Sequence, residues 1–138
     1  MKTARDYSPI LWRRLVIIRD RLERFLDRRG YQVVATPIIE NTDLFLKKSG
    51  GELAAQLYSF TDPSGRNVSL RPEFTSSVVR QLVEGRLKGP LPQRWQYAGT
   101  VFRYEGTVED GAARTQEFQQ FGAELLGAPN EAADAEVL

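Results

Sequence analysis

The stretch that decides the fold is "VFRYEGTVEDGAARTQEFQQFGAELLG", residues 101–127. Two runs rich in aromatic and aliphatic residues flank a loop of glycine, alanine and acidic residues, which predicts two antiparallel strands. The first run carries Arg103 and Glu105, and the second carries Gln120 and Glu124. Because a buried charge without a partner costs several kcal/mol, so much polarity inside a strand pair requires an explanation.

Alternation along the strands gathers these polar side chains on one face. Arg103 and Glu105 share a side of the first strand, and Gln120, Gly122 and Glu124 share a side of the second, because side chains alternate. A glycine inside a strand often marks close approach by a ligand or another backbone. Two interpretations stay open from the alternation alone: a solvent-exposed sheet face with cross-strand ion pairs, or the floor of a pocket for a charged ligand.

The rest of the chain predicts helices and short strands around this ribbon. Ser8 and Pro9 are typical of a helix start, and an apolar repeat continues to a stop at Gly30. The sequence further predicts a strand at 31–37, a short helix within 41–53, a hairpin at 57–71 with its turn at 62–65, a helix over 75–84, strands at 94–105 and 116–127, and a helix beginning near 130. This order predicts an α+β fold, an antiparallel sheet backed by helices, in one domain over residues 1–138.

The segment "LRPEFT", residues 70–75, joins the hairpin to the next helix. Pro72 ends the strand, and Glu73 and Thr75 stand where the chain turns into the helix. Thr75 as an N-cap and Glu73 as a first-turn acid would account for both residues structurally. A ligand-binding role for the same two residues remains the alternative.

Composition restricts the chemistry. The chain has no cysteine and no histidine, which excludes thiol catalysis, thiolate metal sites and histidine general bases from these 138 residues. A bound divalent ion would be a hard, oxygen-liganded one such as magnesium. No apolar run is long enough to cross a membrane and no secretory signal is present, so we expect a cytoplasmic protein.

The charge is unevenly distributed although the net charge is only +1. Residues 1–29 hold nine Lys and Arg against four Asp and Glu, whereas residues 105–138 hold one basic residue against eight acidic ones. The basic end either attracts a polyanion such as nucleic acid or is a solvated helix face with internal ion pairs.

Four stretches in order resemble the catalytic core of a class II aminoacyl-tRNA synthetase, specifically the histidyl-tRNA synthetase family. "GYQVVATPIIENTDLF" resembles motif 1 (about 30–46), whose strand and proline, here Pro37, belong to the dimer interface. "YSFTDPSGRNVSLRPEFT" (about 57–75) resembles the hairpin that leads into Leu-Arg-Pro-Glu-x-Thr. "YAGTVFRYE" and "RTQEFQQFGAELLG" resemble the two strands of motif 2, about 97–127.

The resemblance implies a role for each candidate residue. Arg103 matches the motif 2 arginine that contacts the ATP α-phosphate and the amino-acid carboxylate, and is the implied catalytic residue. Glu105 and Arg114 match further ATP contacts, at the adenine end and the outer phosphates. The implied amino-acid contacts are Glu73, Thr75, Gln120 and Glu124, the last facing the imidazole of histidine.

The implied activity is formation of an aminoacyl-adenylate from histidine and ATP for transfer to tRNA. ATP is then a substrate that carries Mg²⁺, no protein metal site is expected, and a homodimer through the motif 1 region is implied. Nothing matches motif 3 or an anticodon-binding domain, so we expect a fragment that ends before motif 3 and is inactive alone.

A second member of the same fold family is the alternative: the synthetase-like regulatory subunit of ATP phosphoribosyltransferase, in histidine biosynthesis. Phe74 stands where the synthetases typically have glycine, and the loop "GTVEDGAARTQ" carries Glu109 and Asp110 in place of basic residues. The pair Arg103 and Glu105 favours the synthetase.

Overall fold

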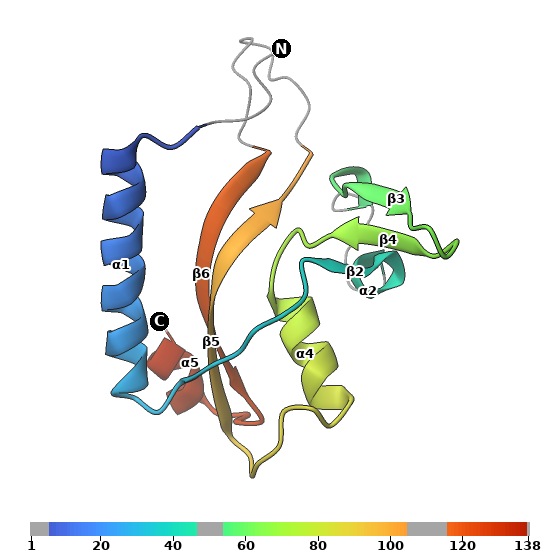
Figure 1. Cartoon of the computed structure of the whole chain (residues 1–138). Helices are drawn as coiled ribbons and strands as arrows, with labels where there is room; N and C mark the ends of the chain where they lie inside the picture. The colour runs from blue at the N-terminus through green and yellow to red at the C-terminus, as the bar shows by residue number, and fades with distance from the viewer. Residues whose placement is uncertain (1–5, 47–53, 105–115, 138) are drawn as a thin grey trace. The chain divides into compact units, whose positions relative to one another are not determined.

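The computed structural model describes residues 6–46, 54–104 and 116–137 (Figure 1). Its elements are α1 (Pro9–Asp27), β1 (Gln32–Val33), β2 (Ile39–Asn41), α2 (Thr42–Leu46), β3 (Ser59–Thr61), β4 (Asn67–Leu70), α4 (Thr75–Val83), β5 (Gln93–Phe102), β6 (Glu117–Leu126) and α5 (Glu131–Val137). Helices and antiparallel strand pairs are combined in one chain, so the predicted α+β class is confirmed.

Helix α1 begins and ends where the sequence predicts. The Ser8 hydroxyl oxygen accepts a hydrogen bond from the Leu11 amide at 3.3 Å, and Pro9 occupies the first helical position. Beyond the C-cap, Gly30 has φ of 80°, a conformation that glycine adopts without a Cβ clash. No residue of α1 is buried, and Arg19 forms ion pairs with Asp20 and Glu23 on its surface. These pairs agree with the solvated-face interpretation for that part of the helix.

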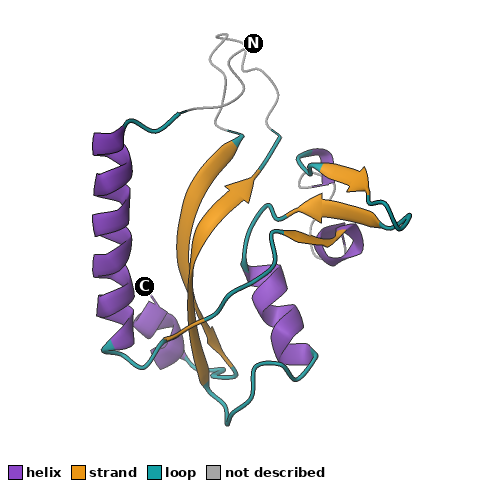
Figure 2. Ribbon diagram, viewed as in Figure 1, coloured by secondary structure: helices purple, strands orange, loops and turns teal. Residues whose placement is uncertain are grey.

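Strands β5 and β6 form the long ribbon predicted by residues 101–127. They are neighbours in a three-stranded sheet of order β1-β5-β6, and their arrows run in opposite directions in Figure 2. β5 ends at Phe102, three residues before the predicted end, so Arg103 follows the strand. On the other edge β1 pairs with β5 in parallel, with Gln32 opposite Trp95.

A second sheet has the order β2-β4-β3, with both pairings antiparallel. Its β3–β4 hairpin is the predicted one, and the Asp62 carboxylate closes the turn by accepting from the amides of Ser64 at 2.8 Å and Arg66 at 2.9 Å. Strand β2 was not predicted. Ile39 pairs with Leu70 at one end of this strand.

The chain divides into two compact units. Unit 1 consists of Met1–Asp6, Thr36–Arg80 and Gly99–Gln120, and unit 2 of Tyr7–Ala35, Gln81–Ala98 and Phe121–Leu138. The core of unit 1 contains Phe45, Phe74, Val78 and Val101. The core of unit 2 contains Tyr31, Val34, Tyr97 and the amide side chain of Gln96. The predicted single domain stays a prediction.

Among residues 6–46, 54–104 and 116–137, no helix combines the length and the apolar character needed to span a membrane.

Candidate active site

Arg103 is anchored in unit 1 by one side-chain and one main-chain hydrogen bond. Its Nε donates to the Pro72 carbonyl oxygen at 2.9 Å, and its amide donates to the Gln116 carbonyl oxygen at 2.9 Å. The guanidinium carbon lies 5.3 Å from the centre of the Phe118 ring. Within the described part of the chain, no carboxylate forms an ion pair with Arg103. A guanidinium held by its Nε in this way can bind an oxyanion through its terminal nitrogens.

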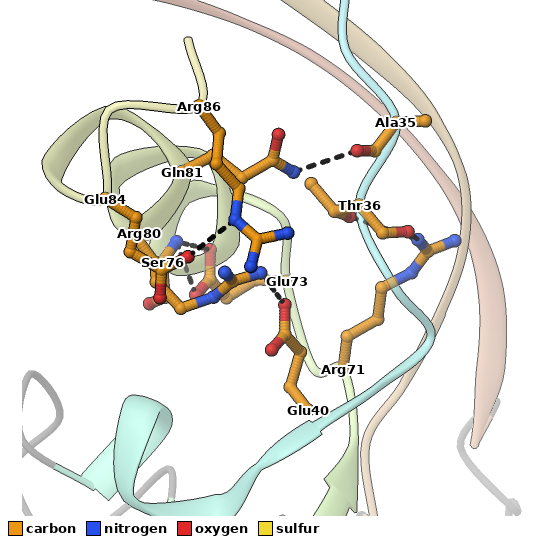
Figure 3. Close-up of polar contacts among 10 residues, drawn as sticks. All are labelled: Ala35, Thr36, Glu40, Arg71, Glu73, Ser76, Arg80, Gln81, Glu84 and Arg86. Atoms are coloured by element: carbon orange, nitrogen blue, oxygen red, sulfur yellow. Dashed lines mark hydrogen bonds and ion pairs between the residues drawn. The ribbon is translucent and has the colours of Figure 1, made fainter.

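Glu73 lies at the N-terminus of α4, and its carboxylate caps this helix. The Ser76 amide donates to both Glu73 carboxylate oxygens, at 3.0 and 3.1 Å (Figure 3). Thr75, the N-cap in the structural interpretation, is the first residue of α4, and Glu73, its first-turn acid, supplies the carboxylate that caps the helix. A carboxylate has lone pairs for about four hydrogen bonds, so the cap does not exhaust Glu73 as an acceptor.

Gln120 presents an unsatisfied acceptor in unit 1. Its amide oxygen is buried and has no hydrogen-bond partner within the described residues. A buried carbonyl oxygen without a donor costs about 1–3 kcal/mol, so this oxygen can accept from a donor beyond the described residues. An ammonium or an N–H group of a ligand is a donor of the required kind.

Sequence reasoning missed Arg71, which is only 6% exposed in unit 1. Its Nε donates to the Thr100 carbonyl oxygen at 2.8 Å. Its Nη1 donates to the carbonyl oxygen of Thr36, which lies beside it in Figure 3, at 2.9 Å. Burial lowers the pKa of this guanidinium from its ordinary value. A signal was present in the sequence, because Arg71 stands between Leu70, the last residue of the strand, and Pro72.

A partly buried ion pair joins β2 to α4 in the same unit. The Nη2 of Arg80 lies 2.7 Å from the Glu40 carboxylate, and the two side chains are 20% and 9% exposed (Figure 3). Neither residue was predicted as part of a site. The pair fixes the segment after Pro37 to the helix that Glu73 caps.

Glu124 belongs to unit 2, as does Tyr97. The Tyr97 hydroxyl donates to the Glu124 carboxylate at 3.0 Å. A Cβ on Gly122 would come within 2.5 Å of the Tyr97 ring. The prediction that Gly122 leaves room for a ligand is therefore wrong, because the aromatic ring fills that space.

The structure thus brings some predicted residues together and leaves others separate. Arg103 is hydrogen-bonded to Pro72, the residue before Glu73. Thr75 is the first residue of the helix that Glu73 caps. Gln120 lies in the same unit. Glu105 and Arg114 lie outside the described residues, so their predicted roles stay predictions. Arg103, Glu73 and Gln120 supply a cation, a carboxylate and an unsatisfied amide oxygen, which is a set suited to an amino acid and a phosphate.

In the part of the chain that the structure describes, no group of three or more acidic side chains could hold a metal ion. A magnesium ion at this site would need most of its oxygen ligands from a phosphate and from water.

A sequence model described as histidyl-tRNA synthetase matches residues 3–138. The chain belongs to the histidyl-tRNA synthetase family. Among curated relatives, it is similar to the histidine–tRNA ligase of Pyrococcus furiosus, with 44% identity over 142 residues that cover 100% of this chain and 31% of that protein. The chain thus spans about a third of the length of the family members it matches.

Solved structures of the family have the same fold. The chain superposes on an ATP phosphoribosyltransferase regulatory subunit/histidyl-tRNA synthetase from Bacillus halodurans C with a TM-score of 0.84 and 26% identity, covering 98% of this chain and 34% of that one. It superposes on apo S. aureus histidyl-tRNA synthetase with a TM-score of 0.78 and 31% identity, covering 99% and 35%. The fold is that of the synthetase-like core.

Proposed function

We propose that this chain is part of the catalytic core of a histidine–tRNA ligase, a class II synthetase that binds ATP and histidine. The observation that carries the proposal is Arg103, a guanidinium with its Nε fixed on Pro72 and with no carboxylate partner in the described region. Family membership and the unsatisfied oxygen of Gln120 support it.

The proposed reaction joins histidine to the adenylyl group of ATP. A carboxylate oxygen of histidine attacks the α-phosphorus of ATP, a new P–O bond forms, and the bond to the bridging oxygen of the β-phosphate breaks. Pyrophosphate leaves with that electron pair. Such a step depends on positioning and on neutralising charge rather than on a general base. A histidine-free segment is compatible with it.

Each residue has a role in this scheme. Arg103 makes forked hydrogen bonds to the α-phosphate and the histidine carboxylate. Glu73, Thr75 and Gln120 accept from the α-ammonium group. Glu124, oriented by the Tyr97 hydroxyl, accepts from the imidazole. Glu105 and Arg114 complete the contacts to adenine and the outer phosphates.

The partners follow from this chemistry. Mg²⁺ arrives with ATP and is ligated mainly by phosphate oxygens. The tRNA accepts the histidyl group. We place the protein in the cytoplasm, where these substrates meet.

The test is histidine-dependent exchange of pyrophosphate into ATP by the full-length protein. Arg103→Ala should reduce the exchange rate by about 100-fold or more, because an electrostatic contact to the transition state is lost. Arg66→Ala is the matched control, since Arg66 is an exposed arginine of the same unit that pairs with Asp62 at the hairpin turn. If the wild type catalyses the exchange and Arg103→Ala catalyses it equally well, the role assigned to Arg103 is refuted.

The regulatory subunit of ATP phosphoribosyltransferase is the second candidate. One observation favours it: the Bacillus halodurans protein, which is named for both functions, superposes with a TM-score of 0.84. In that case the full-length protein would show no exchange, and histidine would change its binding to a phosphoribosyltransferase subunit. Both measurements on one preparation separate the two candidates.

Association through the motif 1 region is part of the proposal. Ile38 and Ile39, directly after Pro37, are 49% and 52% exposed, which is unusual for adjacent isoleucines beside a strand. A second copy of the protein would cover them. Sedimentation of the wild type and of Ile38→Glu tests this proposal: the charge should weaken association by at least about tenfold, and a monomeric wild type at high concentration would overturn it.

A further inference from the structure

Arg71 joins three separate segments of unit 1 through one side chain. Its Nη1 donates to the Thr36 carbonyl oxygen at 2.9 Å and to the Thr36 hydroxyl at 3.2 Å. Its Nε donates to the Thr100 carbonyl oxygen in β5 at 2.8 Å. A planar guanidinium can serve both acceptors at once because its donors point in fixed, divergent directions.

The main chain of Arg71 reinforces the same junction. Its amide donates to the Ile38 carbonyl oxygen at 2.8 Å, and its carbonyl oxygen accepts from the Phe102 amide at 3.0 Å. The next residue, Pro72, accepts from the Nε of Arg103 at 2.9 Å. Arg71 is therefore one residue away from the group that orients Arg103.

Close packing around the Arg71 guanidinium restricts where it can lie. Its carbon lies 4.1 Å from the centre of the Phe74 ring. A Cβ added at Gly99 would come within 2.7 Å of the Arg71 Nη2 and within 3.2 Å of the Phe74 ring. The absence of a side chain at Gly99 and the bulk of Phe74 together define the slot. Phe74, the departure from the usual glycine, is thus the surface on which Arg71 rests.

The charge of Arg71 has no counter-ion in the described residues, since its acceptors are carbonyl and hydroxyl oxygens. A buried cation without a carboxylate is unfavourable for stability alone, and breaking its hydrogen bonds would be costly. Its value lies in holding the segments that surround it.

We propose that Arg71 is a positioning residue for adenylate formation: it holds the turn that carries Pro72 and Glu73 against β5, so that Arg103 is oriented before substrate arrives. This inference rests on the proposed function for its kinetic part. Arg71 acts through Pro72 and touches neither substrate.

The kinetic test compares Arg71→Met, Arg71→Lys and Arg66→Met in the full-length protein. Both Arg71 variants should lower kcat for pyrophosphate exchange by about 100-fold, because a small misplacement of a reacting group has that effect. KM for ATP should change by less than about threefold. Lysine keeps the charge but lacks the fork, so recovery of wild-type kcat by Arg71→Lys would overturn the inference. Arg66→Met should match the wild type.

A direct readout distinguishes this inference from the proposed function. Hydrogen exchange at the Arg103 Nε, measured by nitrogen-15 NMR on this chain, should accelerate by about tenfold or more in Arg71→Met and Arg71→Lys, because the bond to Pro72 loosens. Thr36→Val, which removes only the hydroxyl acceptor, should give a smaller change in the same direction and covers the case of variants that do not fold. Unchanged Arg103 Nε exchange in the folded variants would overturn the positioning role. Absent pyrophosphate exchange in the wild type would refute only the proposed function.

Discussion

The ring of Tyr97 lies directly against Gly122 in unit 2, so close that an added Cβ would sit 2.5 Å from two atoms of the ring and from its hydroxyl oxygen. The same Tyr97 directs its hydroxyl to the Glu124 carboxylate at 3.0 Å. Gly122 is thus needed for a side chain of the protein itself. Because Gly122 has no side chain, Tyr97 can reach Glu124, the residue proposed to recognise the imidazole.

We expect Gly122→Ala to reduce the free energy of unfolding by about 1–3 kcal/mol, because the methyl group overlaps the Tyr97 ring. Urea unfolding of this chain measures the change. In a Tyr97→Ala background the same substitution should cost far less, since the overlapping ring is gone. Equal costs in the two backgrounds would show that the clash does not explain the glycine.

Gln96 should be sensitive to charge as well as to size. Its buried Nε2 donates to the Asp27 carboxylate at 2.6 Å and to the Tyr31 carbonyl oxygen at 3.1 Å. Gln96→Leu leaves these acceptors unpaired and should destabilise unit 2 by about 1–3 kcal/mol. Gln96→Glu should cost more, because it sets a second carboxylate against Asp27. A higher melting temperature for Gln96→Glu than for Gln96→Leu would contradict this account.

The pair of Glu40 and Arg80 predicts a specific pattern in unit 1. Glu40→Leu should destabilise the protein by about 1–3 kcal/mol, because it removes a charged hydrogen bond from a half-buried arginine. The double variant Glu40→Leu with Arg80→Met should recover part of that loss, since the arginine that paired with Glu40 is also gone. Chemical denaturation of the single and double variants measures the coupling, and simple additivity would argue against it.

Stability should fall in acid through Glu136 in α5. Its hydrogen bond from Arg94, with a further one from Tyr31, holds the pKa of this carboxyl below its ordinary value of 4.5. A depressed folded-state pKa gives a contribution that is present above the unfolded pKa and is lost as the pH falls below about 4.5 through the folded value. Glu136→Gln should remove this part of the acid sensitivity. Urea midpoints at about pH 7 and about pH 3 compare the two proteins, and identical acid losses would contradict the assignment.

Local chemistry explains what the sequence predicted well. The hairpin was predictable because Asp62, Pro63 and Gly65 are turn formers in sequence, and helix α1 because its cap and apolar repeat are both local. The partner of β5 in the ribbon was predictable because the two strands are close in sequence and share a pattern.

Long-range contacts explain what was missed. Strand β2 has three residues, and its pairing of Ile39 with Leu70 depends on a partner far along the chain. The burial of Arg71 could not be deduced from its neighbours, since its acceptors, Thr36 and Thr100, come from distant segments. Likewise, alternation placed Gly122 on a polar face but could not show that Tyr97 covers it.

The cap that Glu73 provides to α4 has a practical consequence. The carboxylate proposed to meet the substrate ammonium already holds the Ser76 amide through both oxygens. An arriving ammonium would bind the remaining lone pairs of the same carboxylate and weaken its hydrogen bonds from Ser76, so ligand occupancy would be converted into a change in fraying of the first helical turn. The Ser76 amide is thereby an internal reporter whose resonance would follow a histidine titration without any added label at the site.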